Sequence, residues 1–188
     1  MNNIDLIYQY LKEYSKETVE QFDDLMDQAE EDNIFSEEDI SGLCNLLFSV
    51  ERDLENESSY NIEWTIKDRI TETIIILTLK NKSATYFETI AKAINKYRTI
   101  SRPYLETVIE TFLTVFLLGT PDQSEDEIAQ NRSLLLEAMK DYTQDYKEII
   151  KSFCQSNLEQ LKSDKMEDEL PPQVKKLKSS LSEIYNLV

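Results

Sequence analysis

Apolar residues recur every three or four positions along most of this chain, the spacing that places side chains on one face of an α-helix. The first such stretch spans residues 4–31. Ser15 lies within it and is a residue type that caps helices, so one or two helices are expected there. Later stretches follow residues that are typical of helix N-termini: Ser36, Asn61, Ser83, Ser101 and Ser124.

Two of these start signals are more specific than a single capping residue. The last one is followed three residues later by Glu127, which is the spacing of a capping box. Ser36 is followed by Asp39, a weaker variant of the same motif. Phe35 and Ile40 flank this second cap at the positions of a hydrophobic staple, which would fix the angle at which the chain enters the helix.

Residues 73–79, TIIILTL, are apolar and β-branched, so by composition alone they would suit a strand. We expect a helix instead, because Ile66, Ile70 and Ile74 are spaced by four and lead into the block. The chain also contains no second candidate strand to pair with it. A helix that is apolar on all sides is expected at the centre of the fold.

The stretch that begins at Ser124 contains no Gly or Pro until Pro171, and we expect a break near Asp141 or Asn157. Residues 163–173 are polar and include two consecutive prolines, which predicts a linker. Residues 174–188 return to a helical period and predict a short amphipathic C-terminal helix. We expect this helix to dock on the same domain.

Six or seven helices joined by short polar loops predict an all-α fold, with residues 1–162 as a single domain. The helices would form a bundle or a short α-solenoid of helix pairs, and no repeat of fixed period favours one of these. The 188 residues include only 2 Gly and 4 Pro, too few for a turn-rich β protein.

The composition excludes several kinds of chemistry. The chain has no His, so it lacks a His-based triad, a His metal site and a His pH switch. Cys44 and Cys154 are expected to be reduced core thiols, because each lies within or beside an apolar helical stretch. No signal peptide or membrane-spanning run is found, so we expect a soluble, cytoplasmic protein without a cofactor.

The charge of the chain is strongly negative and unevenly distributed. The net charge is −17, and residues 1–63 contain 18 acidic and 3 basic residues. Such a field repels nucleic acids and anionic membranes and attracts basic proteins. We therefore expect a basic protein partner, no direct contact with nucleic acid and no membrane contact, and we leave the oligomeric state open.

Residues 20–39 concentrate this charge, since they contain ten acids and no Lys or Arg. A solvated helix face usually mixes signs, because opposite charges three or four residues apart stabilise a helix and like charges destabilise it. The run is a docking surface for a basic partner or an acidic face that only keeps the protein in solution. The candidate partner-binding residues are Asp23, Asp24, Asp27, Glu30, Glu31, Asp32, Glu37, Glu38 and Asp39.

Within this run, Asp23 to Asp27 spell DDLMD. An Asp-Asp-x-x-Asp motif resembles the one with which all-α isoprenoid synthases hold magnesium and a diphosphate, and this resemblance implies a magnesium-dependent enzyme. A helical wheel, however, places these aspartates on one side and, on the other, the apolar residues Phe22, Leu25, Met26 and Ala29. No second acidic motif follows on a later helix. We therefore favour a solvated face and assign no metal-binding or catalytic residue.

Four basic residues gather near position 97: Lys92, Lys96, Arg98 and Arg102. We expect them to pair with the acidic first third of the chain rather than to form an anion site.

Three functions remain, in order of preference. The first is a non-enzymatic protein-binding module of the inhibitor, immunity-protein or antitoxin type, whose acidic N-terminal third docks a basic partner. The second is a scaffold or adaptor subunit that uses an apolar groove between helices. The third is a magnesium-dependent all-α enzyme built on Asp23, Asp24 and Asp27.

Overall fold

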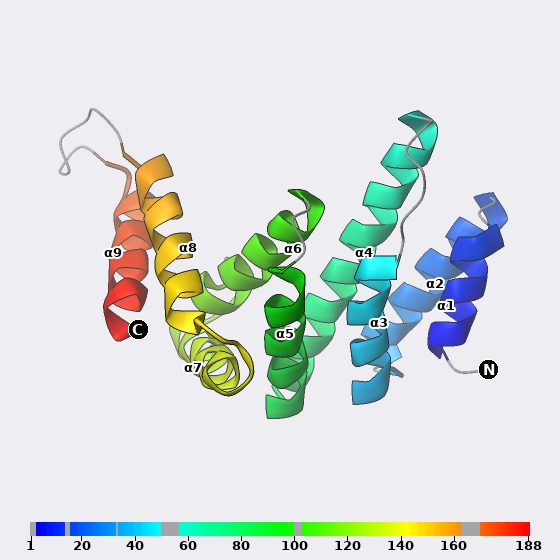
Figure 1. Ribbon diagram of the computed structural model, residues 1–188, viewed down its shortest axis with the longest axis horizontal. Helices are drawn as coiled ribbons and strands as arrows, with labels where there is room; N and C mark the ends of the chain where they lie inside the picture. Colours follow the sequence, from blue (N-terminus) through cyan, green and yellow to red (C-terminus); the bar gives the residue numbers. More distant parts are fainter. Residues whose placement is uncertain (1–2, 14–15, 33, 50–56, 100–102, 163–169) are drawn as a thin grey trace. The chain divides into compact units, whose positions relative to one another are not determined.

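The computed structural model describes residues 3–13, 16–32, 34–49, 57–99, 103–162 and 170–188. These residues form helices and connecting turns, without a strand, so the all-α prediction is confirmed. Figure 1 labels the helices. Their bounds are α1 (Asn3–Glu13), α2 (Lys16–Asp32), α3 (Glu37–Ser49), α4 (Glu57–Asn81), α5 (Ala84–Tyr97), α6 (Pro103–Leu113), α7 (Glu125–Tyr142), α8 (Tyr146–Gln160) and α9 (Pro172–Leu187), with a π-helical turn, η1 (Thr114–Leu118), after α6.

The described residues thus contain nine α-helices where six or seven were predicted. The difference arises because the first and the sixth apolar stretches each form two helices. The first divides between α1 and α2, where Ser15 lies outside the described residues. The sixth stretch divides at Thr143–Asp145, close to the break expected near Asp141. Asn157, the other expected break, lies inside α8.

The chain divides into two compact units, residues 1–93 and residues 94–188. The single domain expected over residues 1–162 stays a prediction, and most of the linker expected at 163–173 lies outside the described residues. No helix in the described parts of the chain is both long and apolar enough to cross a bilayer.

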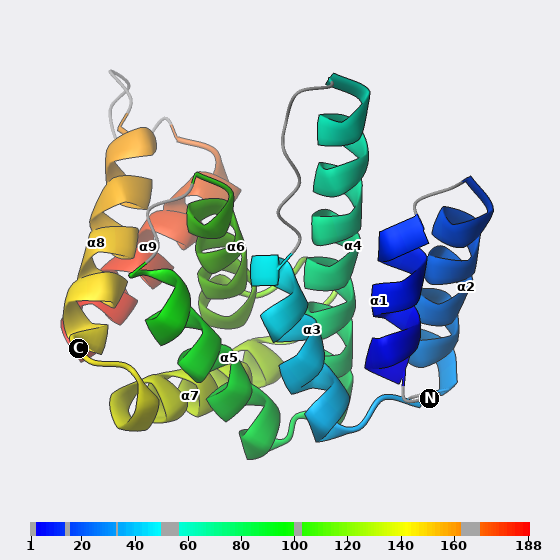
Figure 2. The ribbon, with the colours of Figure 1, turned by 45° about the vertical axis from the view of Figure 1, so that its right-hand side comes forward.

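In the first unit, α2 contacts α1 and α4, and α3 contacts α1 and α4. Figure 2 shows α2 and α4 running in the same direction, with α1 and α3 running the opposite way. The block at 73–79 is helical, as expected. Ile70, Ile74 and Leu77 of this helix are fully buried. The buried hydroxyl of Thr78 donates to the backbone oxygen of Ile74 at 2.7 Å, so its burial leaves no unsatisfied donor.

The predicted cap of α3 is present. The Ser36 amide donates to Asp39 Oδ2 at 2.8 Å, and the Asp39 amide donates to Ser36 Oγ at 3.2 Å. Phe35 and Ile40 on either side are both buried. Val50 and Leu54, which continue the apolar stripe of this helix in the sequence, lie outside the described residues.

In the second unit, η1 contacts α6, α7 and α9, while α8 contacts α6 and α9. α7 begins at a complete capping box between Ser124 and Glu127, as the sequence predicts. Leu181 and Ile184 of α9 are fully buried. Cys154 in this unit and Cys44 in the first are buried thiols outside any disulfide, and burial raises their pKa to about 11 and about 12.

Candidate functional site

The acidic run lies along the solvent side of α2 and continues past the following loop into the first turn of α3. Phe22, Met26 and Ala29 of α2 are buried, and Asp23, Asp24 and Asp27 are exposed. The helical-wheel expectation is met, since the DDLMD aspartates face away from the core. Within the described residues, no group of three or more His, Cys, Asp or Glu side chains is placed to hold a metal ion.

A guanidinium from α4 interrupts this acidic face. Arg69 Nη1 lies 2.7 Å from Glu30 Oε1, Arg69 Nη2 pairs with Asp27 Oδ1, and a looser pair at 3.6 Å joins Nη1 to Glu72 Oε2. The side chains of Arg69 and Glu30 are only 16% and 15% exposed, so this pair is mostly shielded from water. Arg69 therefore ties α2 to α4 and neutralises part of the run.

Two further α4 side chains hold α2 in place. Thr73 Oγ1 donates to Glu30 Oε1 at 2.7 Å. Lys80 Nζ donates to the backbone oxygens of Glu30 and Glu31, at 2.7 and 3.0 Å. These carbonyls belong to the last turn of α2, where a helix leaves its oxygens unpaired and carries a partial negative charge. Glu30 is thus a structural residue that joins two helices rather than a free contact site.

A hollow of about 460 Å³ opens beside Arg69, lined by Asp23, Asp27, Asp68, Arg69 and Glu72. Partial burial raises the pKa of Asp23. Arg69 lowers this pKa, the carboxylates of Asp27 and Asp24 raise it, and the net shift is upward. Burial alone raises the pKa of Asp68. Partial burial, and for Asp23 also the neighbouring carboxylates, makes the charged forms of Asp23 and Asp68 less favourable in the folded protein.

Asp68→Asn is expected to stabilise the protein slightly at neutral pH. A raised pKa means that folded Asp68 holds its proton more tightly than unfolded Asp68. Ionisation of Asp68 therefore lowers the free energy of unfolding as the pH rises from the pKa of the unfolded state, near 3.8, through the higher pKa of the folded state. Urea unfolding at neutral pH should show a higher midpoint for Asp68→Asn than for wild type, and the difference should vanish in acid. Glu106→Gln, at an exposed position of α6, is the control.

At the start of α3, two of the candidate acids also have partners. Asp39 closes the cap with Ser36, and Glu37 Oε1 accepts a long hydrogen bond of 3.5 Å from Ser83 Oγ. Asp39 is therefore engaged in helix capping. Glu37 is exposed and keeps most of its capacity to accept hydrogen bonds.

The other candidate acids remain without a base. Within the described part of the chain, the side chains of Asp24, Glu31, Asp32 and Glu38 are exposed and form no ion pair. The same corner contains Ile34, whose side chain is 39% exposed in the loop between α2 and α3. We call these five residues the acidic corner. The exposed Ile34 was not anticipated, because a single Ile in a loop has no periodic signal.

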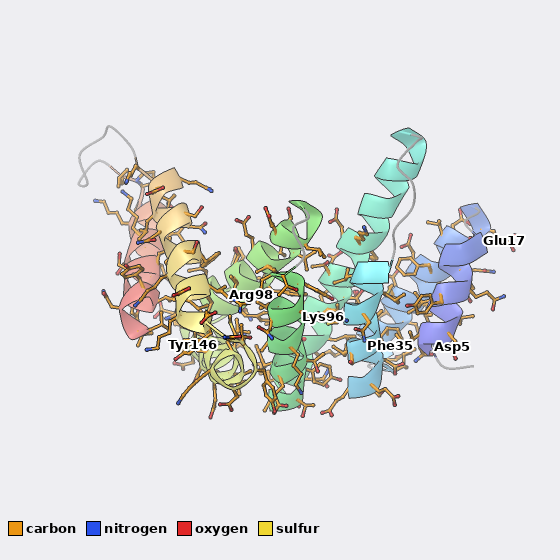
Figure 3. All side chains as sticks on the ribbon, viewed as in Figure 1. Asp5, Glu17, Phe35, Lys96, Arg98 and Tyr146 are labelled. Carbon is orange, nitrogen blue, oxygen red and sulfur yellow. The ribbon has the colours of Figure 1, made fainter. Side chains whose placement is uncertain are left out.

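Two of the basic residues near position 97 have ion-pair partners outside the acidic first third. Lys92 pairs with Glu88 on its own helix at 3.6 Å, and Arg98 pairs with Asp145 at 3.5 Å. Figure 3 labels Lys96 and Arg98 at the C-terminal end of α5 and Tyr146 at the start of α8. Arg102 lies outside the described residues. Arg69 and Lys80, which the sequence did not single out, make the contacts with the acidic run.

No protein-family model, curated protein or solved structure matches the chain.

Proposed function

We propose that this chain is a non-enzymatic protein-binding module that docks a basic protein through the acidic corner. The observation that carries the proposal is the set of exposed carboxylates that no base of the described chain neutralises. Asp23, Asp27, Glu30, Glu37 and Asp39 take supporting roles, because they set the surrounding field or hold α2 and α3 in place. The proposal holds for a bundle and for a short solenoid alike.

Folding stability does not account for the charges at this corner. Glu31 and Asp32 occupy the last turn of α2, which contains no base. An acid at a helix C-terminus destabilises the helix by about 0.3–1 kcal/mol. Lys80 offsets part of this by bonding the terminal carbonyls, but it forms no ion pair with either carboxylate. A basic partner would supply the missing neutralisation.

The exposed Ile34 adds an apolar contact residue to the carboxylates of the acidic corner, a combination typical of protein interfaces. Protein interfaces combine an apolar centre with a polar rim, and the centre usually contributes most of the binding energy. The carboxylates of Asp32 and Glu38 flank Ile34 in sequence. The partner would steer in along the negative field and then seat an apolar contact on Ile34, with its own cationic surface occluded. An inhibitor or immunity protein acts in this way.

The test compares two variants of equal charge. The first neutralises the corner with Asp24→Asn, Glu31→Gln, Asp32→Asn and Glu38→Gln. The control neutralises four exposed acids of the second unit, Glu106, Glu110, Asp141 and Glu148. Tagged wild-type chain is expected to capture a basic protein from a lysate of its source, the control variant is expected to retain it, and the corner variant is expected to lose at least about tenfold in affinity.

The salt dependence of binding and the variant Ile34→Ser provide two further tests. Binding of the captured protein should weaken steeply between about 0.05 and 0.5 M salt, because rim charges are screened. Ile34→Ser should weaken binding without changing the salt dependence. If both charge variants retain the same partners and salt has little effect, the acidic corner is only a solvated face. The scaffold hypothesis, with an apolar groove as the contact, would then replace the proposal.

A further inference from the structure

A groove of about 500 Å³ lies on the second unit between α7 and α9. Two ion pairs join these helices, Glu125 to Lys176 at 2.9 Å and Arg132 to Glu183 at 3.7 Å. The two pairs are separated by seven residues on α7 and by seven residues on α9. Figure 2 shows α7 and α9 running in the same direction. The groove has the size typical of small-molecule sites and lies between helices, where such sites are common.

Arg132 of α7 lines the groove and is held by a hydrogen bond to the backbone. It is 14% exposed, and its Nε donates to the backbone oxygen of Leu117 at 2.9 Å, near the end of η1. The contact of Nη1 with Glu183, at 3.7 Å, is too long for a hydrogen bond. Within the described residues, the Nη groups therefore donate to no acceptor, although the guanidinium is largely shielded from water. A largely shielded guanidinium whose Nη groups form only one long ion pair can accept a further anion.

The walls of the groove combine aliphatic side chains with polar ones, among them Ser133 and Glu137 of α7. Leu136 lies one turn further along α7, and Leu187, 60% exposed, lines the facing side on α9. Lys140 lies two turns beyond Arg132, about 12 Å along the helix axis. It is exposed and has no ion-pair partner in the described chain. The groove thus offers a fixed guanidinium, then an aliphatic surface, then a second cation.

We propose that this groove binds an aliphatic carboxylate, with the carboxylate on the Nη groups of Arg132 and the hydrocarbon chain over Leu136 and Leu187. The planar fork of a guanidinium matches a carboxylate with two parallel hydrogen bonds. Glu183 competes for the same donors, but its side chain is 64% exposed and turns into water when the ligand binds. The negative charge of the whole chain opposes an anion only weakly here, because screening limits that field to about 8 Å.

Calorimetric titration with decanoate tests the proposal, with acetate and decylamine as comparison probes. Decanoate is expected to bind one site, whereas acetate and decylamine bind at least about tenfold more weakly. Arg132→Lys keeps the charge and loses the fork, so decanoate affinity should fall at least about tenfold. Glu183→Gln removes the competing carboxylate and should raise the affinity. Glu125→Gln breaks the other ion pair between α7 and α9, away from the groove, and should change nothing.

Leu187→Ser keeps the test decisive if Arg132→Lys disturbs the end of η1. Leu187 is mostly exposed, so its replacement leaves the fold intact and should lower decanoate affinity without affecting acetate. The proposal is overturned if decylamine binds as well as decanoate. It is also overturned if Glu183→Gln and Leu187→Ser both bind decanoate as the wild type does, which would indicate non-specific association of an amphiphile.

Discussion

Replacing Arg69 with alanine is expected to lower the free energy of unfolding by about 2–4 kcal/mol near neutral pH, because removing one partner of a shielded ion pair leaves the other charge uncompensated. Among the described residues, Glu30 would keep only Thr73 as a side-chain donor, and Asp23, Asp27 and Glu72 would repel one another across the hollow. The exposure of Asp27 and Glu72, at 66% and 63%, keeps the expected loss below that of a fully buried pair. Urea unfolding followed by circular dichroism measures this loss.

The pH dependence separates a charge effect from lost packing. The pKa of Asp23 would be higher without the guanidinium, which lowers it in the wild type, so folded Arg69→Ala binds protons more readily than folded wild type. The stability gap between the two proteins should therefore be largest at neutral pH and shrink in acid. Glu72→Gln, which removes only the loose pair, should cost about 0.5 kcal/mol or less. An equal loss for Arg69→Ala at both pH values would mean that packing, and not charge, is responsible.

Gly119→Ala is expected to destabilise the second unit by about 2–5 kcal/mol, the sum of backbone strain and overpacking. Gly119 follows η1 with φ +83° and ψ 178°, a conformation that is essentially restricted to glycine. A Cβ at this position would also lie 2.4 Å from Cγ1 of Ile128. The midpoint of urea unfolding, followed by circular dichroism, should fall accordingly.

A second glycine and a double variant separate these two causes. Gly42, inside α3, would place a Cβ 2.6 Å from Cγ1 of Ile4 but has an ordinary helical backbone. Gly42→Ala should therefore cost much less, since alanine favours the helix by about 1 kcal/mol and only one side chain must move. Ile128→Ala combined with Gly119→Ala should cost less than the sum of the single changes. Strict additivity would show that backbone strain alone determines the loss.

The positions of the helices were largely predictable because the signals are local. Helical period, capping residues and prolines act within a few residues of one another, and so α3, α5 and α7 begin where Ser36, Ser83 and Ser124 indicate. The block at 73–79 is helical for the same reason: isoleucines four residues apart lead into it, and this helical spacing outweighs the strand preference of its β-branched residues. The number of helices was wrong because the breaks between α1 and α2 and at Thr143–Asp145 leave the apolar period on both sides unchanged.

The division of the acidic run into paired and free carboxylates was not predictable. The sequence identifies every acid of the run, but Arg69 is 42 residues from Asp27 and Lys80 is 50 residues from Glu30. The basic residues near position 97 were equally plausible partners by charge alone. Side-chain pairing depends on which helices pack together, and helix packing depends on the burial of apolar faces across the whole unit.

By itself, therefore, the sequence determined the helical class, several helix starts and the strongly acidic character of the first third, although α4 begins at Glu57 and not at Asn61. Each of these follows from residues that interact within one or two helical turns or from a simple sum of charges. Only the tertiary structure decided that Asp27 and Glu30 tie α2 to α4, and that Arg132 lies in a groove with unused donors. The physical reason is that both features depend on the distance between helices that are remote in sequence, which local spacing does not encode.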